Sequence, residues 1–305
     1  FVCRAHFKAM MANKQMQYTT TPDNIQLYVT SWLVEHARAA VLIVHGIGEH
    51  SGRYGHVIAA LNARGYSVFA YDQRGHGKSG GQRMYIETPD LLPDDVAVVR
   101  ESLYAEMGNL PLFVYGHSMG SLVSLAYAID HQEDLAGLIL TGAPLDFDSS
   151  VSPVLMAVSK VANRLLPRMQ ALDLVNPKDL SHDPAVVKAY QDDPLNHHGR
   201  LSVRAGTSLL ALLSNIRERL KELIVPLLLL HGASDAICPS SGSQMIYDRA
   251  ASADKTLTIY PELFHEIHNE PEQATVLSDI LAWLDAHTAA SPEAASTPPM
   301  DSSQP

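Results

Sequence analysis

Residues 114–121 of the 305-residue chain read Val-Tyr-Gly-His-Ser-Met-Gly-Ser, and they are its strongest indication of a fold. It closes a short β-prone run at 112–115 and opens an apolar segment with the pattern of a buried helix. Strand, Gly-x-Ser-x-Gly and helix in this order predict a sharp turn that presents Ser118 as a nucleophile. Gly116 and Gly120 leave room for the backbone beside that turn.

A serine hydroxyl is a weak nucleophile until a base accepts its proton, so the chain must supply a base and an acid. Asp235 follows the apolar run 227–230, and His265 follows the run 256–260. The order Ser, Asp, His along the chain is the order used with this kind of turn. We expect His265 to accept the proton of Ser118 and Asp235 to orient the imidazole.

Two alternatives stay open for the base and the acid. His268 lies three residues after His265 and competes with it as the base. Asp146 and Asp148 follow another predicted strand and compete with Asp235 as the acid. We favour His265 because it lies nearer the strand end, and Asp235 because it fits the chain order.

The developing oxyanion needs preorganised hydrogen-bond donors, which backbone N–H groups can supply. Residues 45–48, His-Gly-Ile-Gly, form a loop directly after the buried run 40–44. We expect the N–H groups of Ile47 and Met119 to form the oxyanion hole.

Short apolar runs alternate with helical patterns along the chain. The expected strands cover residues 25–31, 40–44, 67–71, 112–115, 137–141, 226–230 and 256–260. This alternation predicts the α/β class, with a mostly parallel central sheet flanked by helices. Residues 142–225 carry helical patterning without a convincing strand, which predicts a helical insertion over the carboxyl ends of the core strands.

The insertion divides the expected domain organisation. The core is predicted to occupy residues 18–145 and 225–288, and the cap or lid residues 146–224. Residues 1–17 are expected to be disordered or vector-derived. Residues 289–305, rich in Ala, Ser and Pro, are expected to form a disordered tail.

Composition limits the partners. The net charge of −11 without a basic block argues against nucleic acid. No apolar run approaches the ~20 residues of a membrane span, and no signal peptide is recognisable, so we expect a cytoplasmic protein. The pair His197-His198 comes without a ligand cluster, so no metal is predicted. Cys238 is expected near the pocket, either as a small buried side chain or as a thiol that electrophiles reach.

Three motifs together carry a family resemblance. They are residues 45–54 (His-Gly-Ile-Gly-Glu-His-Ser-Gly-Arg-Tyr), 72–79 (Asp-Gln-Arg-Gly-His-Gly-Lys-Ser) and 116–120 (Gly-His-Ser-Met-Gly). With the spacing of Asp235 and His265, the combination resembles the α/β-hydrolase superfamily and, more narrowly, monoacylglycerol lipases of the bacterial type. The resemblance covers roughly residues 20–288 and is weakest in the cap.

This resemblance implies a cofactor-independent serine hydrolase that cleaves monoacylglycerol to fatty acid and glycerol through an acyl-enzyme. In such lipases a narrow polar pocket holds glycerol, and Glu49, Arg53 and His268 match its lining. An apolar tunnel under the cap holds the acyl chain. The candidate tunnel or lid residues are Leu145, Val151, Leu155, Val158 and Leu174. An apolar cap surface would also allow transient peripheral contact with a lipid interface.

The same motifs fit other functions. A lysophospholipase or a broad carboxylesterase would use the same triad. A non-catalytic protein of this fold that binds a small ligand is an alternative from another class, because such proteins can keep their triads. The sequence leaves the acyl-chain length and the oligomeric state open.

Overall fold

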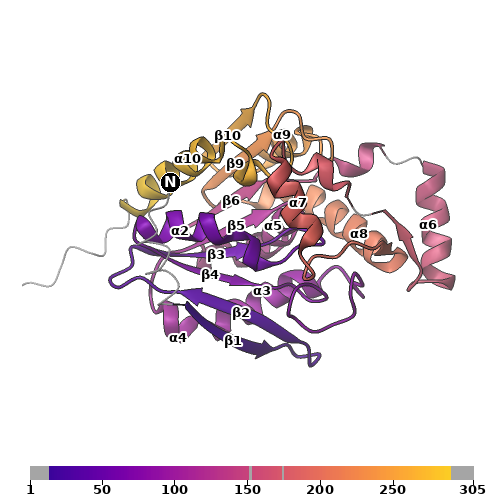
Figure 1. Ribbon diagram of the computed structural model, residues 1–305, viewed down its shortest axis with the longest axis horizontal. Coiled ribbons are helices and arrows are strands. Elements are labelled where there is room, and N and C mark those ends of the chain that lie inside the picture. The colour runs from indigo at the N-terminus through magenta and orange to yellow at the C-terminus, as the bar shows by residue number, and fades with distance from the viewer. Residues whose placement is uncertain (1–13, 151–152, 174, 290–305) are drawn as a thin grey trace, which may run out of the picture.

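A computed structural model describes residues 14–150, 153–173 and 175–289. Its centre is an eight-stranded sheet in the order β1-β2-β4-β3-β5-β6-β9-β10 (Figure 1). The strands are β1 (Lys14–Thr20), β2 (Gln26–Trp32), β3 (Ala39–Val44), β4 (Tyr66–Tyr71), β5 (Leu112–His117), β6 (Gly137–Thr141), β9 (Leu227–Gly232) and β10 (Lys255–Tyr260). β2 pairs antiparallel with β1 and β4, and every other neighbouring pair is parallel, as the α/β expectation requires.

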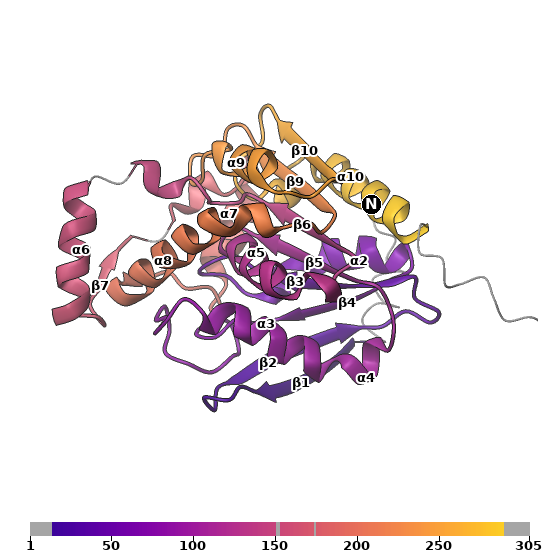
Figure 2. The same cartoon turned by 180° about the vertical axis from the view of Figure 1, so that it is seen from behind.

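The central strands are apolar throughout because helices cover both faces of the sheet. Every residue of β3, β4 and β5 is buried. α2 (Gly55–Ala63) and α10 (Gln273–Ala289) pack on one face (Figure 1), and α3 (Leu91–Ser102), α5 (Met119–His131), α8 (Val203–Arg219) and α9 (Ser241–Arg249) pack on the other (Figure 2). α4 (Tyr104–Met107) follows α3 as a separate turn. The two apolar layers hold the carboxyl ends of the parallel strands at one edge.

The segment between β6 and β9 contains both helices and strands. Its helices are α6 (Pro153–Leu165), α7 (Pro184–Asp192) and α8, and α6 stands out at one end of the molecule (Figures 1 and 2). The expectation of a strand-free insertion was wrong: β7 (Gln170–Leu172) pairs antiparallel with β8 (Leu201–Ser202). Strands of three and two residues are too short to show a period in the sequence. The inner face of α8 joins the main core cluster.

The prediction of disorder at the amino end was wrong for residues 14–17. They form the first half of β1, where Lys14 pairs with Trp32 and Gln17 with Val29. The strand was missed because its mixed polar sequence lies at the edge of the sheet, with exposed and half-buried side chains. Residue 289 ends α10, and residues 1–13 and 290–305 lie outside the described part. Within the described residues, none of the helices combines the length and apolarity that a membrane crossing needs.

Candidate active site

Ser118 sits at the apex of a strained turn between β5 and α5. Its φ of 52° and ψ of −122° place a non-glycine residue where L side chains are uncommon. The Ser118 N–H donates to the carbonyl of Thr141 at 2.9 Å. A Cβ on Gly116 would lie 2.6 Å from the carbonyl oxygen of Gly120, and one on Gly120 would lie 2.0 Å from that of Val44. Two glycines and close backbone packing therefore impose this strain on Ser118, which is itself buried.

His265 and Asp235 form a buried pair at the ends of β10 and β9. The Nδ1 atom of His265 lies 2.7 Å from Oδ2 of Asp235. The other carboxylate oxygen accepts the N–H groups of Ile237 and Cys238, each at 2.8 Å. Nε2 of His231 lies 3.2 Å from Oδ2. Four contacts hold the carboxylate in one orientation, which in turn fixes the His265 ring.

The environment keeps Asp235 ionised and makes His265 more basic. Burial alone would raise the pKa of Asp235, but the charge of His265 and the hydrogen bonds from His231, His265 and the Cys238 N–H lower it. Burial would lower the pKa of His265, but the negative charge of Asp235, with Glu266 and Glu49 adding to it, raises that pKa above its ordinary value. Such a ring can take up a proton and release it again.

A narrow cavity brings together four of the predicted residues, Ser118, His265, Ile47 and Glu49. The lining comes from the turn at Ser118, the loops that follow β3 and β10, and the cap at and just before α7. The lining residues are Gly46, Ile47, Glu49, His117, Ser118, Val175, Leu180, Tyr190, His265 and Glu266. Sequence reasoning missed Val175, Leu180, Tyr190 and Glu266. The only sequence signal for Glu266 was that it directly follows His265. The other three residues lie in the cap, where no sequence pattern shows which side chains point inward.

The two predicted oxyanion donors lie beside Ser118. Ile47 lines the cavity, and Met119 begins α5, whose amino end carries partial positive charge. The loop of Ile47 is braced from behind, because the Gln73 N–H donates to Nε2 of His45 at 2.9 Å and Gln73 Nε2 donates to the His45 carbonyl at 2.5 Å. The Gly46 N–H donates to Glu49 Oε1 at 2.6 Å. The loop can therefore hold its free N–H groups in place without rearrangement.

Comparison with known proteins fits this geometry. A family model described as Hydrolase_4: Serine aminopeptidase, S33 matches residues 35–272. The chain belongs to this family of serine hydrolases. Monoacylglycerol lipase of Mycolicibacterium smegmatis is 38% identical over 250 residues, covering 82% of this chain and 89% of the relative. Human monoglyceride lipase is 35% identical, covering 83% and 84%.

Solved structures agree with the α/β-hydrolase fold of this serine ester hydrolase. The crystal structure of Paleococcus ferrophilus monoacylglycerol lipase superposes with a TM-score of 0.78 at 32% identity, covering 86% of this chain and 99% of that one. A soluble variant of monoglyceride lipase from Saccharomyces cerevisiae, in complex with a substrate analog, gives 0.79 at 25% identity, covering 90% and 95%. The expected fold class is confirmed.

In this hydrolase two of the three predicted glycerol residues, Glu49 and Arg53, form a buried ionic network with Glu266. Arg53 Nη1 donates to Glu49 Oε2 at 2.7 Å and to Glu266 Oε1 at 2.5 Å, and its Nη2 donates to Glu266 Oε2 at 2.7 Å. Glu49 lines the cavity, and Arg53 lies behind it with its guanidinium over the Tyr190 ring at 4.9 Å. His268 is fully buried and is not among the residues that line the cavity.

The alternative residues are occupied elsewhere. His268 stacks on Tyr54, with ring centroids 5.0 Å apart, and its pKa is lowered well below the ordinary value, first by burial. Asp146 accepts a hydrogen bond from Ser241 at 2.6 Å, and Asp148 accepts one from Arg217 at 2.9 Å. The structure thus pairs His265 with Asp235 and places the competing residues in other contacts.

The predicted tunnel and lid residues are spread over different surroundings. Leu145 is fully buried, whereas Val158 on α6 is 56% exposed and does not line the cavity. Leu155 lies in α6, but its side chain, together with Val151 and Leu174, lies outside the described residues. Cys238 is buried, and burial raises the pKa of its thiol well above the ordinary value, which disfavours the reactive thiolate.

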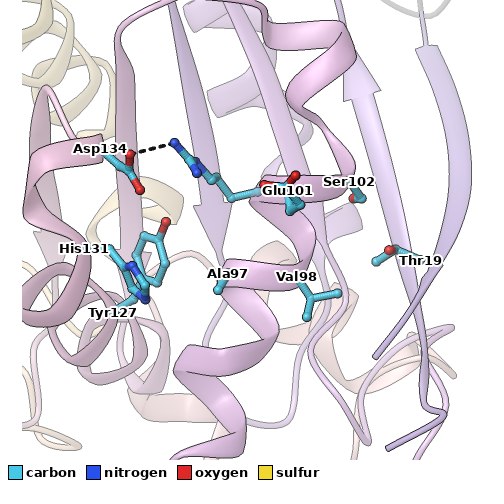
Figure 3. A pocket seen from close by; sticks show the side chains of 9 residues that line it. Thr19, Ala97, Val98, Glu101, Ser102, Tyr127, His131 and Asp134 are labelled. Carbon is cyan, nitrogen blue, oxygen red and sulfur yellow. Dashed lines mark ion pairs between the residues drawn. The ribbon is translucent and has the colours of Figure 1, made fainter. Parts of the chain in front are cut away.

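A second hollow lies away from this site, between β1, α3 and α5 (Figure 3). Ala97 and Val98 form part of its wall, and His131 and Asp134 lie at one end. His131, Glu133 and Asp134 could bring ligand atoms within 4.8 Å of one another, but Arg100 already pairs with Asp134 at 2.8 Å. We assign no metal or substrate to this hollow.

Proposed function

We propose that this chain is a monoacylglycerol lipase in which Ser118, His265 and Asp235 form the catalytic triad. One observation carries the proposal: the strained Ser118 and His265 line one narrow cavity, and Asp235 bonds to His265 from behind it. The similarity to monoacylglycerol lipases over more than four fifths of the chain supports the substrate class.

The proposed reaction has two steps. His265 accepts the proton of Ser118 as its oxygen attacks the ester carbonyl, and Asp235 stabilises the imidazolium that forms. The N–H groups of Ile47 and Met119 stabilise the oxyanion, each contributing about 2.7–4 kcal/mol to the transition state. His265 then gives its proton to the departing alcohol. Water attacks the acyl-enzyme by the same route and releases the fatty acid.

We also propose that the outer face of α6 contacts the lipid interface from which substrate enters. Its exposed apolar side chains, Val158, Val161 and Leu165, are 56%, 61% and 69% exposed. They recur at intervals of three and four residues and therefore form one stripe along the helix. An exposed apolar stripe of this kind lowers the cost of lifting a monoacylglycerol from a bilayer.

Turnover of purified protein on 1-monooleoylglycerol, dioleoylglycerol, 1-oleoyl-lysophosphatidylcholine and p-nitrophenyl butyrate tests the proposal. We expect monoacylglycerol to be the best lipid substrate and Ser118→Ala to lower kcat by about 10⁴-fold or more on every ester. Preference for the lysophospholipid or the short ester would keep the triad and exclude the lipase assignment. A folded protein that neither turns over nor labels with a fluorophosphonate at Ser118 would be a binding protein of this fold.

A further inference from the structure

Two carboxylates share one guanidinium beside the proposed active site. Glu266 and Glu49 both line the cavity, with side chains only 3% exposed, and Arg53 behind them is 9% exposed. Both oxygens of Glu266 and one oxygen of Glu49 accept from Arg53. Because Arg53 neutralises only one of the two charges, the network keeps one excess negative charge in a site that solvent screens poorly.

Nothing else in the lining offsets this charge. Among the described residues that line the cavity, none is lysine or arginine. Burial lowers the pKa of His117 to about 3, so that ring is neutral at physiological pH. His268 and His56, which lie behind the cavity, also have lowered pKa values because they are buried. When His265 takes up the proton of Ser118, its positive charge is balanced by the carboxylate of Asp235 2.7 Å away, so this pair leaves the excess negative charge of the network uncompensated.

The alcohol oxygen of a bound ester must lie close to Glu266, because His265 and Glu266 are consecutive residues that both line the cavity. The departing alkoxide takes its proton from His265, so the alcohol oxygen has to lie beside that ring. Glu266 is the next residue of the same loop, and its N–H donates to the Leu180 carbonyl at 2.8 Å, which fixes the loop against the cap. Val175, Leu180 and Ile47 supply the apolar part of the lining, which suits an acyl chain.

We propose that the Glu49–Arg53–Glu266 network selects against anionic alcohol groups, and that Glu266 is a specificity-determining residue. The inference rests on the proposed ester hydrolysis and deepens it: a neutral glycerol head group is accepted, and a phosphate on the same alcohol is repelled. Each carboxylate keeps its hydrogen bonds without substrate, so a phosphate would find no unpaired cation to compensate the repulsion. The network would thereby favour monoacylglycerols over lysophospholipids whose alcohol carries a net negative charge.

The test uses three small soluble esters, so that no lipid interface is involved: glycerol monobutyrate, 1-butyryl-glycerol 3-phosphate and butyrylcholine. Butyrate release gives kcat/KM for the neutral, anionic and cationic alcohol. We expect the wild-type protein to disfavour the anionic ester at least tenfold against each of the other two. Equal kcat/KM for the anionic and cationic esters would overturn the inference.

Three variants locate the effect. Glu266→Gln should lower the ratio of kcat/KM for the neutral ester to kcat/KM for the anionic ester about tenfold or more. Glu266→Asp keeps the charge and should preserve this ratio even if kcat falls. Glu262→Gln is the matched control, because Glu262 lies on the same loop but is exposed, so its ratio should stay at the wild-type value. A folded Glu266→Gln protein with an unchanged ratio would refute the role of Glu266.

The two proposals fail in different ways. If the protein does not prefer monoacylglycerol but still disfavours the anionic ester, the lipase assignment alone is excluded. If the protein prefers monoacylglycerol but hydrolyses the anionic ester as well as the neutral and cationic esters, this inference alone is excluded. If Glu266→Gln does not fold, the wild-type series of three esters still decides.

Discussion

Among single residues, Gly116 and Gly120 matter to the turn at Ser118 because they have no side chains. Ser118 keeps a positive φ because Gly116 and Gly120 allow β5 and α5 to approach the backbone of β3 and each other. A substitution at Gly120 places a Cβ 2.0 Å from the carbonyl oxygen of Val44, which is backbone and has no freedom to swing away. The turn itself would have to move.

We therefore expect Gly120→Ala to lower the free energy of unfolding by about 1–3 kcal/mol and to abolish most turnover. Urea unfolding and p-nitrophenyl butyrate hydrolysis measure the two effects. Gly55→Ala is the control, because its Cβ would have nothing within 4 Å and its φ of −53° is helical. That variant should match the wild type or gain up to about 1 kcal/mol. A Gly120→Ala protein of wild-type stability and rate would contradict this account of the turn.

The residues that sequence reasoning found and missed differ in how they are marked. Ser118 is marked by glycines at fixed offsets, and Asp235 and His265 by the strand ends that precede them. Glu266 is marked only by its position after His265, and its importance comes from Arg53, which lies 213 positions earlier. Partners across that distance come together only through the sheet, so spacing in the sequence does not show them.

At the scale of elements, α6 is the part of the cap with the most exposed apolar surface. Val161 and Leu165 are 61% and 69% exposed and lie one turn apart. Burying both in a bilayer surface would contribute about 1.5–3 kcal/mol per fully buried side chain. We expect the double variant Val161→Ser, Leu165→Ser to bind phosphatidylcholine vesicles at least tenfold more weakly in a sedimentation assay.

The same double variant should hydrolyse soluble glycerol monobutyrate at the wild-type rate. Substitution of exposed side chains usually changes stability by no more than about 0.5 kcal/mol, so the fold should persist. Unchanged vesicle binding in this variant would exclude α6 as the lipid-contacting element.

Element boundaries were predictable where burial is continuous and were not where elements are short. β3 is expected at residues 40–44 and spans Ala39–Val44, because every one of its side chains is buried and apolar. The helical pattern around residues 93–108 is divided between two elements, with α3 ending at Ser102 and α4 covering Tyr104–Met107. β7 and β8 are held by their mutual pairing, which no local pattern encodes.

At the scale of the whole molecule, the order of the strands is the part that local patterns leave undetermined. β4 lies between β2 and β3, and β9 lies beside β6 although the entire cap separates them in the sequence. Right-handed crossovers limit the possible orders without choosing one. The expectation that Ser118, Asp235 and His265 meet came from the parallel sheet, whose strands end at one edge, and from the order Ser, Asp, His along the chain.

The fold should be sensitive to acid because it buries neutral histidine rings. His76 and His117 are both buried, and burial lowers the pKa of each to about 3. In the unfolded chain these rings bind protons near pH 6.5, so between about pH 6.5 and pH 3 the unfolded state holds more protons than the folded state. Burying these two rings in their neutral form costs no stability above pH 6.5, and the free energy of unfolding falls as the pH drops from 6.5 toward 3.

We expect the free energy of unfolding to fall by up to about 1.4 kcal/mol per pH unit for each of these two histidines in that window. Urea unfolding at half-unit steps from pH 8 to pH 4 measures the slope. His76→Gln removes one of the titrating rings and leaves a neutral polar side chain, so the difference in stability between wild type and variant should itself change by about 1.4 kcal/mol per pH unit below pH 6. Other groups cancel in that difference, because both proteins carry them. If the two curves run parallel from pH 8 to pH 4, the His76 ring binds its proton equally well in the folded and unfolded protein, and its burial is not what makes the fold sensitive to acid.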